Sequence, residues 1–243
     1  MMTFEHPIEW TDKNVSRLWD YYSRTPPYSE IYFSKVFGDR ILKKSGLPLN
    51  QEIEVLDFGC GPGFIWEHLR NLDSAWNYTG LDFSPDSVSK LQANAKGHPK
   101  FKGVHHISQL PTNLPSEQYD VVLMFEVVEH LKNEYLDSTL VEANRLLKRG
   151  GVLVITTPNN EDLSKSTRFC PDCGALFHEW QHVRSWTVTT LANRLKQQGF
   201  DLRQAQTLDF AAHGFVPRGV RLARRLFRGN PGTPHMLAMF QKT

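Results

Sequence analysis

One stretch of the chain, CPDCGALFHEWQHVRSW at 170–186, carries side chains that bind metal ions. Cys170 and Cys173 are separated by two residues, and His178 and His182 follow them. Thiolates and imidazoles at this spacing, with a proline and a glycine in the turn, predict a tetrahedral zinc knuckle. The alternative is a reduced pair of cysteines in a substrate loop. The chain has only 3 cysteines, too few for a disulfide framework, which favours a reducing, cytosolic setting.

A second set of reactive side chains lies in the segment EVVEH. Glu126 and His130 are four residues apart, and Glu129 lies between them. If a helix begins here, all three side chains can converge on one point. Two carboxylates and an imidazole would then serve as acid/base groups or as ligands of a divalent cation. A third interpretation is structural, with Glu129 and His130 capping the helix and packing against a covering segment.

A glycine-rich turn, VLDFGCGPG at 55–63, indicates a ligand site of another kind. Gly59, Gly61 and Gly63 let the backbone turn tightly and approach a ligand that a Cβ atom would block. Asp57 ends the strand before the turn. Asp82 ends the next predicted strand, where an acid accepts hydrogen bonds from a ribose diol. A glycine turn without a ligand is the structural alternative.

The elements that must position these residues alternate between strands and helices. Two helices are predicted within 11–46, one capped by Asp12 and the other ended by Gly46. Apolar runs follow at 53–59, 78–83, 104–107, 119–127 and 151–158, then a helix at 187–198 and strands at 201–209 and 235–242. This order predicts an α/β fold with a doubly wound sheet and a C-terminal antiparallel hairpin. We divide the chain into an N-terminal helical cover at 1–50 and one domain at 51–243, with a substrate loop at about 160–186.

The glycine turn, LDFS at 81–84 and YDVVLMFEVVEHL at 119–131 together resemble class I S-adenosylmethionine (SAM) methyltransferases. The resemblance covers about residues 52–160 and the terminal hairpin. It implies a Rossmann-like, seven-stranded sheet whose last strand is antiparallel between the fifth and the sixth. It also implies bound SAM, with Asp82 on the ribose hydroxyls and Phe83 against adenine. The residues implied in SAM binding are Asp57, Gly59, Cys60, Gly61, Gly63, Asp82, Phe83, Ser108 and Glu126.

The segment EVVEHL is similar to one in ubiquinone-pathway O-methyltransferases and to one in small-RNA 3′-terminal 2′-O-methyltransferases. In the RNA enzymes this segment and a later histidine hold a divalent metal. That implies Mg²⁺ or Mn²⁺ ligands at Glu126, Glu129, His130 and His182. His182 cannot serve this site and a zinc knuckle together. Because a cation that chelates two neighbouring oxygens lowers the pKa of a hydroxyl, the metal interpretation predicts a vicinal diol or catechol acceptor. Without a metal, His130 would act as the base.

The run CPxCG…FHxWxHVRSxT also resembles bacterial methyltransferases associated with surface-glycan genes. It implies a substrate loop in which His178, Trp180, His182 and Arg184 face the acceptor. We therefore expect O-methylation of a glycan or another diol, catalysed by His130 with Glu126, Glu129 and His182. A phenolic or quinone-precursor acceptor, an RNA 2′-hydroxyl, and a SAM-binding regulator without turnover are the rival interpretations.

Arginines cluster in an insertion at about 211–234. Within it, VPRGVRLARRLFRG at 216–229 predicts a basic amphipathic helix that contacts an anionic membrane surface or a lipid-linked or phosphorylated substrate. A solvated helix is the alternative. The formal charge of +2 and the lack of a recognisable RNA-binding module count against nucleic acid. No apolar run is long enough for a transmembrane helix, and the N-terminus lacks a signal-peptide core, so we expect a cytoplasmic protein, at most peripheral at the inner membrane surface.

Overall fold

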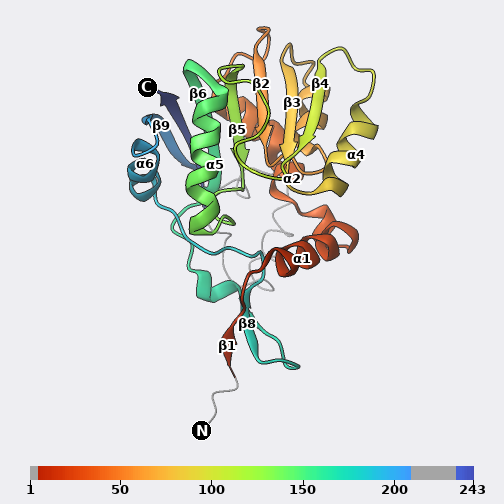
Figure 1. Ribbon diagram of the computed structural model, residues 1–243, viewed down its shortest axis with the longest axis vertical. Helices are drawn as coiled ribbons and strands as arrows, with labels where there is room; N and C mark the ends of the chain where they lie inside the picture. The colour runs from red at the N-terminus through yellow and green to blue at the C-terminus, as the bar shows by residue number, and fades with distance from the viewer. Residues whose placement is uncertain (1–4, 209–233) are drawn as a thin grey trace, which may run out of the picture.

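The protein is built around one seven-stranded sheet, which the computed structural model describes together with its surroundings over residues 5–208 and 234–243 (Figure 1). The strand order is β4-β3-β2-β5-β6-β10-β9. The strands are β2 (Glu54–Phe58), β3 (Asn77–Asp82), β4 (Phe101–His106), β5 (Tyr119–Phe125), β6 (Leu147–Pro158), β9 (Phe200–Leu208) and β10 (His235–Lys242). Strand β10 runs antiparallel to both β6 and β9. The predicted seven-stranded sheet with its C-terminal antiparallel hairpin is therefore confirmed.

Helices cover both faces of this sheet because its central strands are apolar on both sides. One core cluster packs under α2 (Phe33–Ser45), α3 (Phe64–Asn71) and α4 (Pro85–Ala95), and the other under α5 (Asn133–Leu146) and α6 (Val188–Lys196). Alternate residues of β5 divide between the clusters: Val122 and Met124 face α5, whereas Leu123 and Phe125 face α3. This is the doubly wound arrangement that alternating strands and helices predict.

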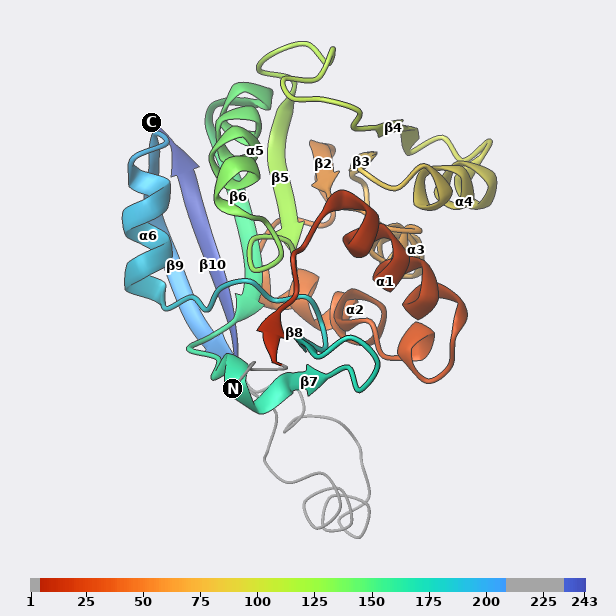
Figure 2. The same cartoon turned by 60° about the horizontal axis from the view of Figure 1, so that its bottom comes forward.

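The N-terminal helix α1 (Asp12–Arg24) lies beyond the carboxyl ends of the parallel strands rather than on a face of the sheet (Figures 1 and 2). Its N-cap is Thr11, whose side chain accepts a hydrogen bond from the backbone N–H of Asn14 at 3.2 Å. The predicted cap, Asp12, is the first helical residue instead, because the extended backbone needed for capping falls one residue earlier. A short 3₁₀ turn, η1 (Tyr28–Glu30), leads into α2, which ends at the predicted Gly46.

A second, three-stranded sheet lies at the same end of the molecule. Its strands are β1 (His6–Pro7), β7 (Thr167–Phe169) and β8 (Ala175–His178), in the order β1-β8-β7, and η2 (Leu163–Ser166) precedes β7. The segment near 160–186 is thus a β-hairpin that pairs in parallel with the N-terminus (Figure 2). A strand of two residues leaves no periodic pattern in a sequence, and this pairing was not predicted.

The basic segment 216–229 lies outside the described residues, so its predicted contact with an anionic partner stays a prediction. Within 5–208 and 234–243, no helix combines the length and apolar character that crossing a bilayer requires.

Candidate functional site

The glycine turn between β2 and α3 has the backbone shape that glycine was expected to supply. Gly59, Gly61 and Gly63 have φ angles of +85°, +52° and +99°. A Cβ atom on Gly63 would lie 2.5 Å from Leu91 Cδ1, so glycine is required there for packing. A Cβ atom on Gly61 would meet no atom of residues 5–208 or 234–243 within 4 Å. Gly61 therefore faces open space, which fits a ligand that approaches the backbone closely.

Two acids flank this turn at the carboxyl ends of β2 and β3. Asp82 accepts hydrogen bonds from the backbone N–H groups of Gly61 and Ser84, both at 2.8 Å. Burial raises its pKa, although these two bonds oppose the shift. Asp57 is only 2% exposed, and burial raises its pKa to about 7 against the hydrogen bond from the Tyr78 hydroxyl. The two acids and the glycine turn lie together, as predicted.

The other residues implied in SAM binding differ in their exposure. Phe83 is 44% exposed, which leaves its ring accessible to a flat ligand, whereas Cys60 is buried. Ser108 is exposed and lines a cavity of about 490 Å³ between the end of β4 and the segment that follows it. The structure therefore brings Ser108 to the same end of the sheet as Asp82.

The segment EVVEH does not form the predicted helix. Glu126 has a φ of +56°, and its N–H donates to the Thr156 carbonyl of β6 at 2.9 Å. The segment forms a turn, and α5 begins only at Asn133. Glu126 Oε2 lies 3.2 Å from His235 Nε2, and Glu126 is not among the described residues whose ligand atoms converge with those of Glu129 and His130. The prediction that Glu126, Glu129 and His130 converge on one helix face is wrong for Glu126.

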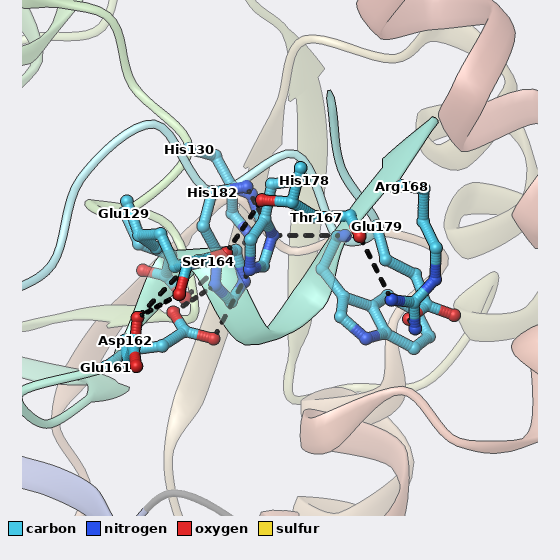
Figure 3. Close-up of polar contacts among 12 residues, drawn as sticks. Glu129, His130, Glu161, Asp162, Ser164, Thr167, Arg168, His178, Glu179 and His182 are labelled. Atoms are coloured by element: carbon cyan, nitrogen blue, oxygen red, sulfur yellow. Dashed lines mark hydrogen bonds and ion pairs between the residues drawn. The ribbon is translucent and has the colours of Figure 1, made fainter. Parts of the chain in front are cut away.

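Glu129 and His130 nevertheless meet a third residue. Ligand atoms of Glu129, His130 and His182, three of the four predicted divalent-cation ligands, lie within 4.8 Å of one another (Figure 3). Glu129 is 1% exposed; its Oε2 accepts a hydrogen bond from Thr157 Oγ1 at 3.0 Å, and its Oε1 accepts none from the described residues. His130 Nε2 is 3.8 Å from Oε1.

Burial makes the neutral forms of these side chains favourable. It raises the pKa of Glu129 well above its usual range, and repulsion from Glu126 adds to the effect. It also lowers the pKa of His130 to about 3, with His182 contributing in the same direction. A charged carboxylate or imidazolium is costly to bury without a partner of opposite charge, so burial shifts both pKa values toward the neutral forms.

Two further side chains, Glu161 and His178, lie beside the cluster formed by Glu129, His130 and His182. Glu161 Oε2 lies 2.5 Å from His182 Nδ1, and Glu161 Oε1 lies 3.5 Å from His178 Nε2. The rings of His178 and His182 stack with centroids 4.5 Å apart. Burial opposes ionisation of Glu161, but the bonds to His178 and His182 outweigh it and lower its pKa to about 2. Glu161 was not predicted, because nothing in the sequence distinguishes it from other loop acids.

The structure does not form the predicted zinc knuckle. Cys170 and Cys173 lie at the turn of the β7–β8 hairpin, where the Gly174 N–H donates to the Cys170 carbonyl at 2.9 Å. Among the described residues, neither cysteine belongs to a group whose ligand atoms could share a metal ion with His178 or His182. The hairpin directs the cysteines to its tip and the histidines toward the sheet, so the four cannot converge.

Helix α1 covers the cluster formed by Glu129, His130 and His182, which it contacts through Trp19. The Trp19 ring lies edge-on against His130, with centroids 5.2 Å apart, and its indole N–H donates to Gln181 Oε1 at 3.2 Å. Gln181 in turn donates to the His130 carbonyl at 2.9 Å. Trp180 and Arg184 were predicted to face an acceptor. Trp180 instead packs against Tyr22, and the Arg184 guanidinium donates to the Leu131 carbonyl at 2.5 Å.

The sheet order, the antiparallel β10 and the glycine turn with its acids define the class I SAM-dependent methyltransferase fold. A family model described as a methyltransferase domain matches residues 29–205. Since that match covers well over half of the chain, the chain belongs to this methyltransferase domain family.

Several curated relatives are similar over the central part of the chain. The mitochondrial ubiquinone biosynthesis O-methyltransferase of Candida albicans is 28% identical over 136 residues, which are 54% of this chain and 40% of the relative. The ubiquinone biosynthesis O-methyltransferase of Pelagibacter ubique is 27% identical over 62% of this chain and 60% of its own. A probable SAM-dependent methyltransferase of Mycolicibacterium smegmatis is 29% identical over 61% and 52%. The chain thus spans about 40–60% of these relatives.

Solved structures share the fold over nearly the whole chain. The 1,6-didemethyltoxoflavin-N1-methyltransferase of Burkholderia thailandensis, solved with S-adenosylhomocysteine, has a TM-score of 0.63 at 17% identity, covering 98% of this chain and 93% of its own. A protein of Pyrococcus horikoshii has a TM-score of 0.63 at 16% identity, covering 97% and 100%. At these identities the likeness concerns the fold alone.

Proposed function

We propose that this protein transfers a methyl group from SAM to a hydroxyl oxygen of a catechol-type acceptor, with a divalent cation held by Glu129, His130 and His182. The observation that carries the proposal is the buried Glu129 carboxylate, whose Oε1 has no hydrogen-bond donor among the described residues. An orphaned carboxylate oxygen directed at two imidazoles is a site that a cation would satisfy.

The residues fit both groups that the reaction needs. SAM supplies the methyl group on a sulfonium centre, and Gly61, Asp57 and Asp82 offer it an open backbone and two acids. A divalent cation lowers the pKa of a hydroxyl and fixes two neighbouring oxygens. One carboxylate and two imidazoles suit Mn²⁺ better than Mg²⁺, which prefers oxygen ligands.

The metal-free alternative, with His130 as sole base, is less well supported. Its pKa of about 3 makes the ring a weak proton acceptor at neutral pH, whereas a general base works best with a pKa near the operating pH. Helix α1 also covers the ring through Trp19. In this proposal Trp19 and helix α1 exclude water from His130 and hold its neutral ring in place.

The choice of acceptor draws on the relatives. Two of the three curated relatives described above are named ubiquinone biosynthesis O-methyltransferases, and that name points to a phenolic acceptor. None of the three is named for a glycan. A catechol offers two adjacent oxygens, as does a vicinal diol. We therefore favour the phenolic acceptor over the glycan expected from the loop.

The test is methyl transfer from radiolabelled SAM to 3,4-dihydroxybenzoate and to its monohydroxy analogue, with EDTA and with Mn²⁺ or Mg²⁺ added back. We expect transfer to the catechol only, lost with EDTA and restored best by Mn²⁺. Glu129→Gln should be inactive. Glu179→Gln is a matched control, because Glu179 pairs with Arg168 in the same loop, apart from the cluster (Figure 3).

Transfer that EDTA does not affect would remove the cation from the proposal. Equal transfer to the monohydroxy analogue would remove the requirement for two oxygens. Transfer to an RNA 3′-terminal ribose or to a glycan, with none to the catechol, would replace the acceptor. SAM binding with no transfer to any of these would favour the regulator.

A further inference from the structure

Glu161 is a largely but not fully buried acid on the opposite side of His182 from His130 (Figure 3). Its side chain is 10% exposed, and its ion-pair partners among the described residues are two histidines rather than a lysine or an arginine. The cation proposed above does not use it. A buried carboxylate with only imidazole partners requires N–H groups directed at both of its oxygens.

The hydrogen bonds of His178 fix where its proton lies. His178 Nδ1 accepts from the backbone N–H groups of Trp180 at 3.3 Å and His182 at 3.2 Å. A neutral imidazole has one N–H, so a ring that accepts at Nδ1 carries its proton on Nε2. That N–H faces Glu161 Oε1. His178 therefore has no lone pair to offer at Nε2, and Glu161, His178 and His182 do not form a second cation site.

His182 has the opposite arrangement. Its Nδ1 lies 2.5 Å from Glu161 Oε2, in direct hydrogen-bond contact with a carboxylate oxygen that can only accept. The proton of the neutral ring is therefore on Nδ1, and Nε2 keeps its lone pair. Stacking against His178, with ring planes 19° apart, holds the plane of the His182 ring.

We propose that Glu161 is a positioning residue, which keeps the proton of His182 on Nδ1 and thereby presents the Nε2 lone pair to the space shared with Glu129 and His130. The use of that lone pair, as a cation ligand, rests on the proposed function. The tautomer itself rests only on the hydrogen bonds. Carboxylates that hold the distal N–H of a ligating histidine commonly change metal affinity 10- to 100-fold.

The first measurement is a long-range ¹H–¹⁵N NMR spectrum of the metal-free wild-type protein with ¹⁵N-labelled histidine at neutral pH. Spectra of His178→Gln and His182→Gln assign the two rings. We expect the Nδ1–H form for His182 and the Nε2–H form for His178. Either ring in the other form would overturn the inference, whether or not the protein binds a metal.

The second measurement compares Glu161→Leu, which removes both acceptor oxygens, with Glu161→Gln, which retains one. In Glu161→Leu we expect loss of the pure Nδ1–H form and Mn²⁺ binding 10- to 100-fold weaker by titration calorimetry. Glu161→Gln should keep part of both properties, and it replaces the leucine variant if that one does not fold. Glu179→Gln should match the wild type in both.

The two proposals fail in different ways. If the tautomers are as expected but wild-type protein does not bind Mn²⁺, the cation site fails and the role of Glu161 stands. If Mn²⁺ binds and Glu161→Leu changes neither its affinity nor the tautomer, the role of Glu161 is overturned and the cation site stands.

Discussion

Replacing Asp57 with Asn should change how the stability of the SAM-free protein depends on pH. Asp57 lies on β2 and is 2% exposed. Burial raises its pKa from an ordinary value of 3.8 to about 7; the Tyr78 hydroxyl, at 2.7 Å, opposes this rise, and Asp82 adds to it. Over that range the folded protein holds a proton that the unfolded chain has already released.

The sign and the size follow from this difference. Because the folded pKa is raised, the stabilising contribution of protonated Asp57 is complete below 3.8 and is lost as the pH rises to about 7. The total loss is about 4 kcal/mol, at 1.36 kcal/mol per pKa unit. Asparagine binds no proton. The free energy of unfolding of D57N should therefore rise relative to wild type by about 2.3 kcal/mol between pH 5 and pH 7, and then level off above pH 7.

The assay is urea unfolding at each pH unit from 5 to 9. D57N is compared with wild type and with Y78F, which keeps the carboxylate but removes the hydrogen bond that lowers its pKa. In Y78F the point at which the pH dependence levels off should move to higher pH. A difference between D57N and wild type that stays constant from pH 5 to pH 8 would refute the reasoning from burial.

Further predictions concern the glycine turn and the acid after β3. Gly61→Ala should cost about 1–2 kcal/mol of stability because of its positive φ. It should also weaken SAM binding, because the added Cβ would occupy the open space in which we expect SAM to approach the backbone. Gly63→Ala should lose roughly 1–3 kcal/mol more, since its Cβ would lie 2.5 Å from Leu91 Cδ1. Thermal unfolding and SAM titration check both, and equal stability of the two variants would contradict the packing argument. Asp82→Ala should abolish the rise in melting temperature that SAM produces in the wild type, and a variant that SAM still stabilises normally would exclude Asp82 from the site.

The parts of the fold that follow from local patterns were predictable. The last strand was predicted at 235–242 and observed as His235–Lys242, because its apolar residues pack on both faces of the sheet. The prediction of a helix at EVVEH was wrong because of a contact with a distant part of the chain. The four-residue spacing of Glu126 and His130 fits a helix, but the Glu126 N–H bonds to the Thr156 carbonyl on the neighbouring strand, and Glu126 has a positive φ. Tertiary pairing overrides propensity there.

The site was predictable in its residue types more than in its partners. The glycine turn, Asp57 and Asp82 follow from a strand–turn–helix pattern that places them by chain connectivity alone. The loop histidines follow no such rule, since their positions depend on a hairpin that pairs with His6 and Pro7 at the N-terminus. Cysteine and histidine spacing therefore suggested a knuckle that this pairing excludes.

The position of His182 depends on the backbone around it. The Gln181 side chain donates to the His130 carbonyl, and the Val183 N–H donates to the Glu129 carbonyl, both at 2.9 Å. These bonds on either side fix the register of the loop against the EVVEH turn, so that His182 lies opposite His130. A shift of one residue would place a different side chain there, although the composition of the loop would be unchanged. The proposed cation site therefore depends on the register between two irregular segments, which the residue types and spacing within either segment do not determine.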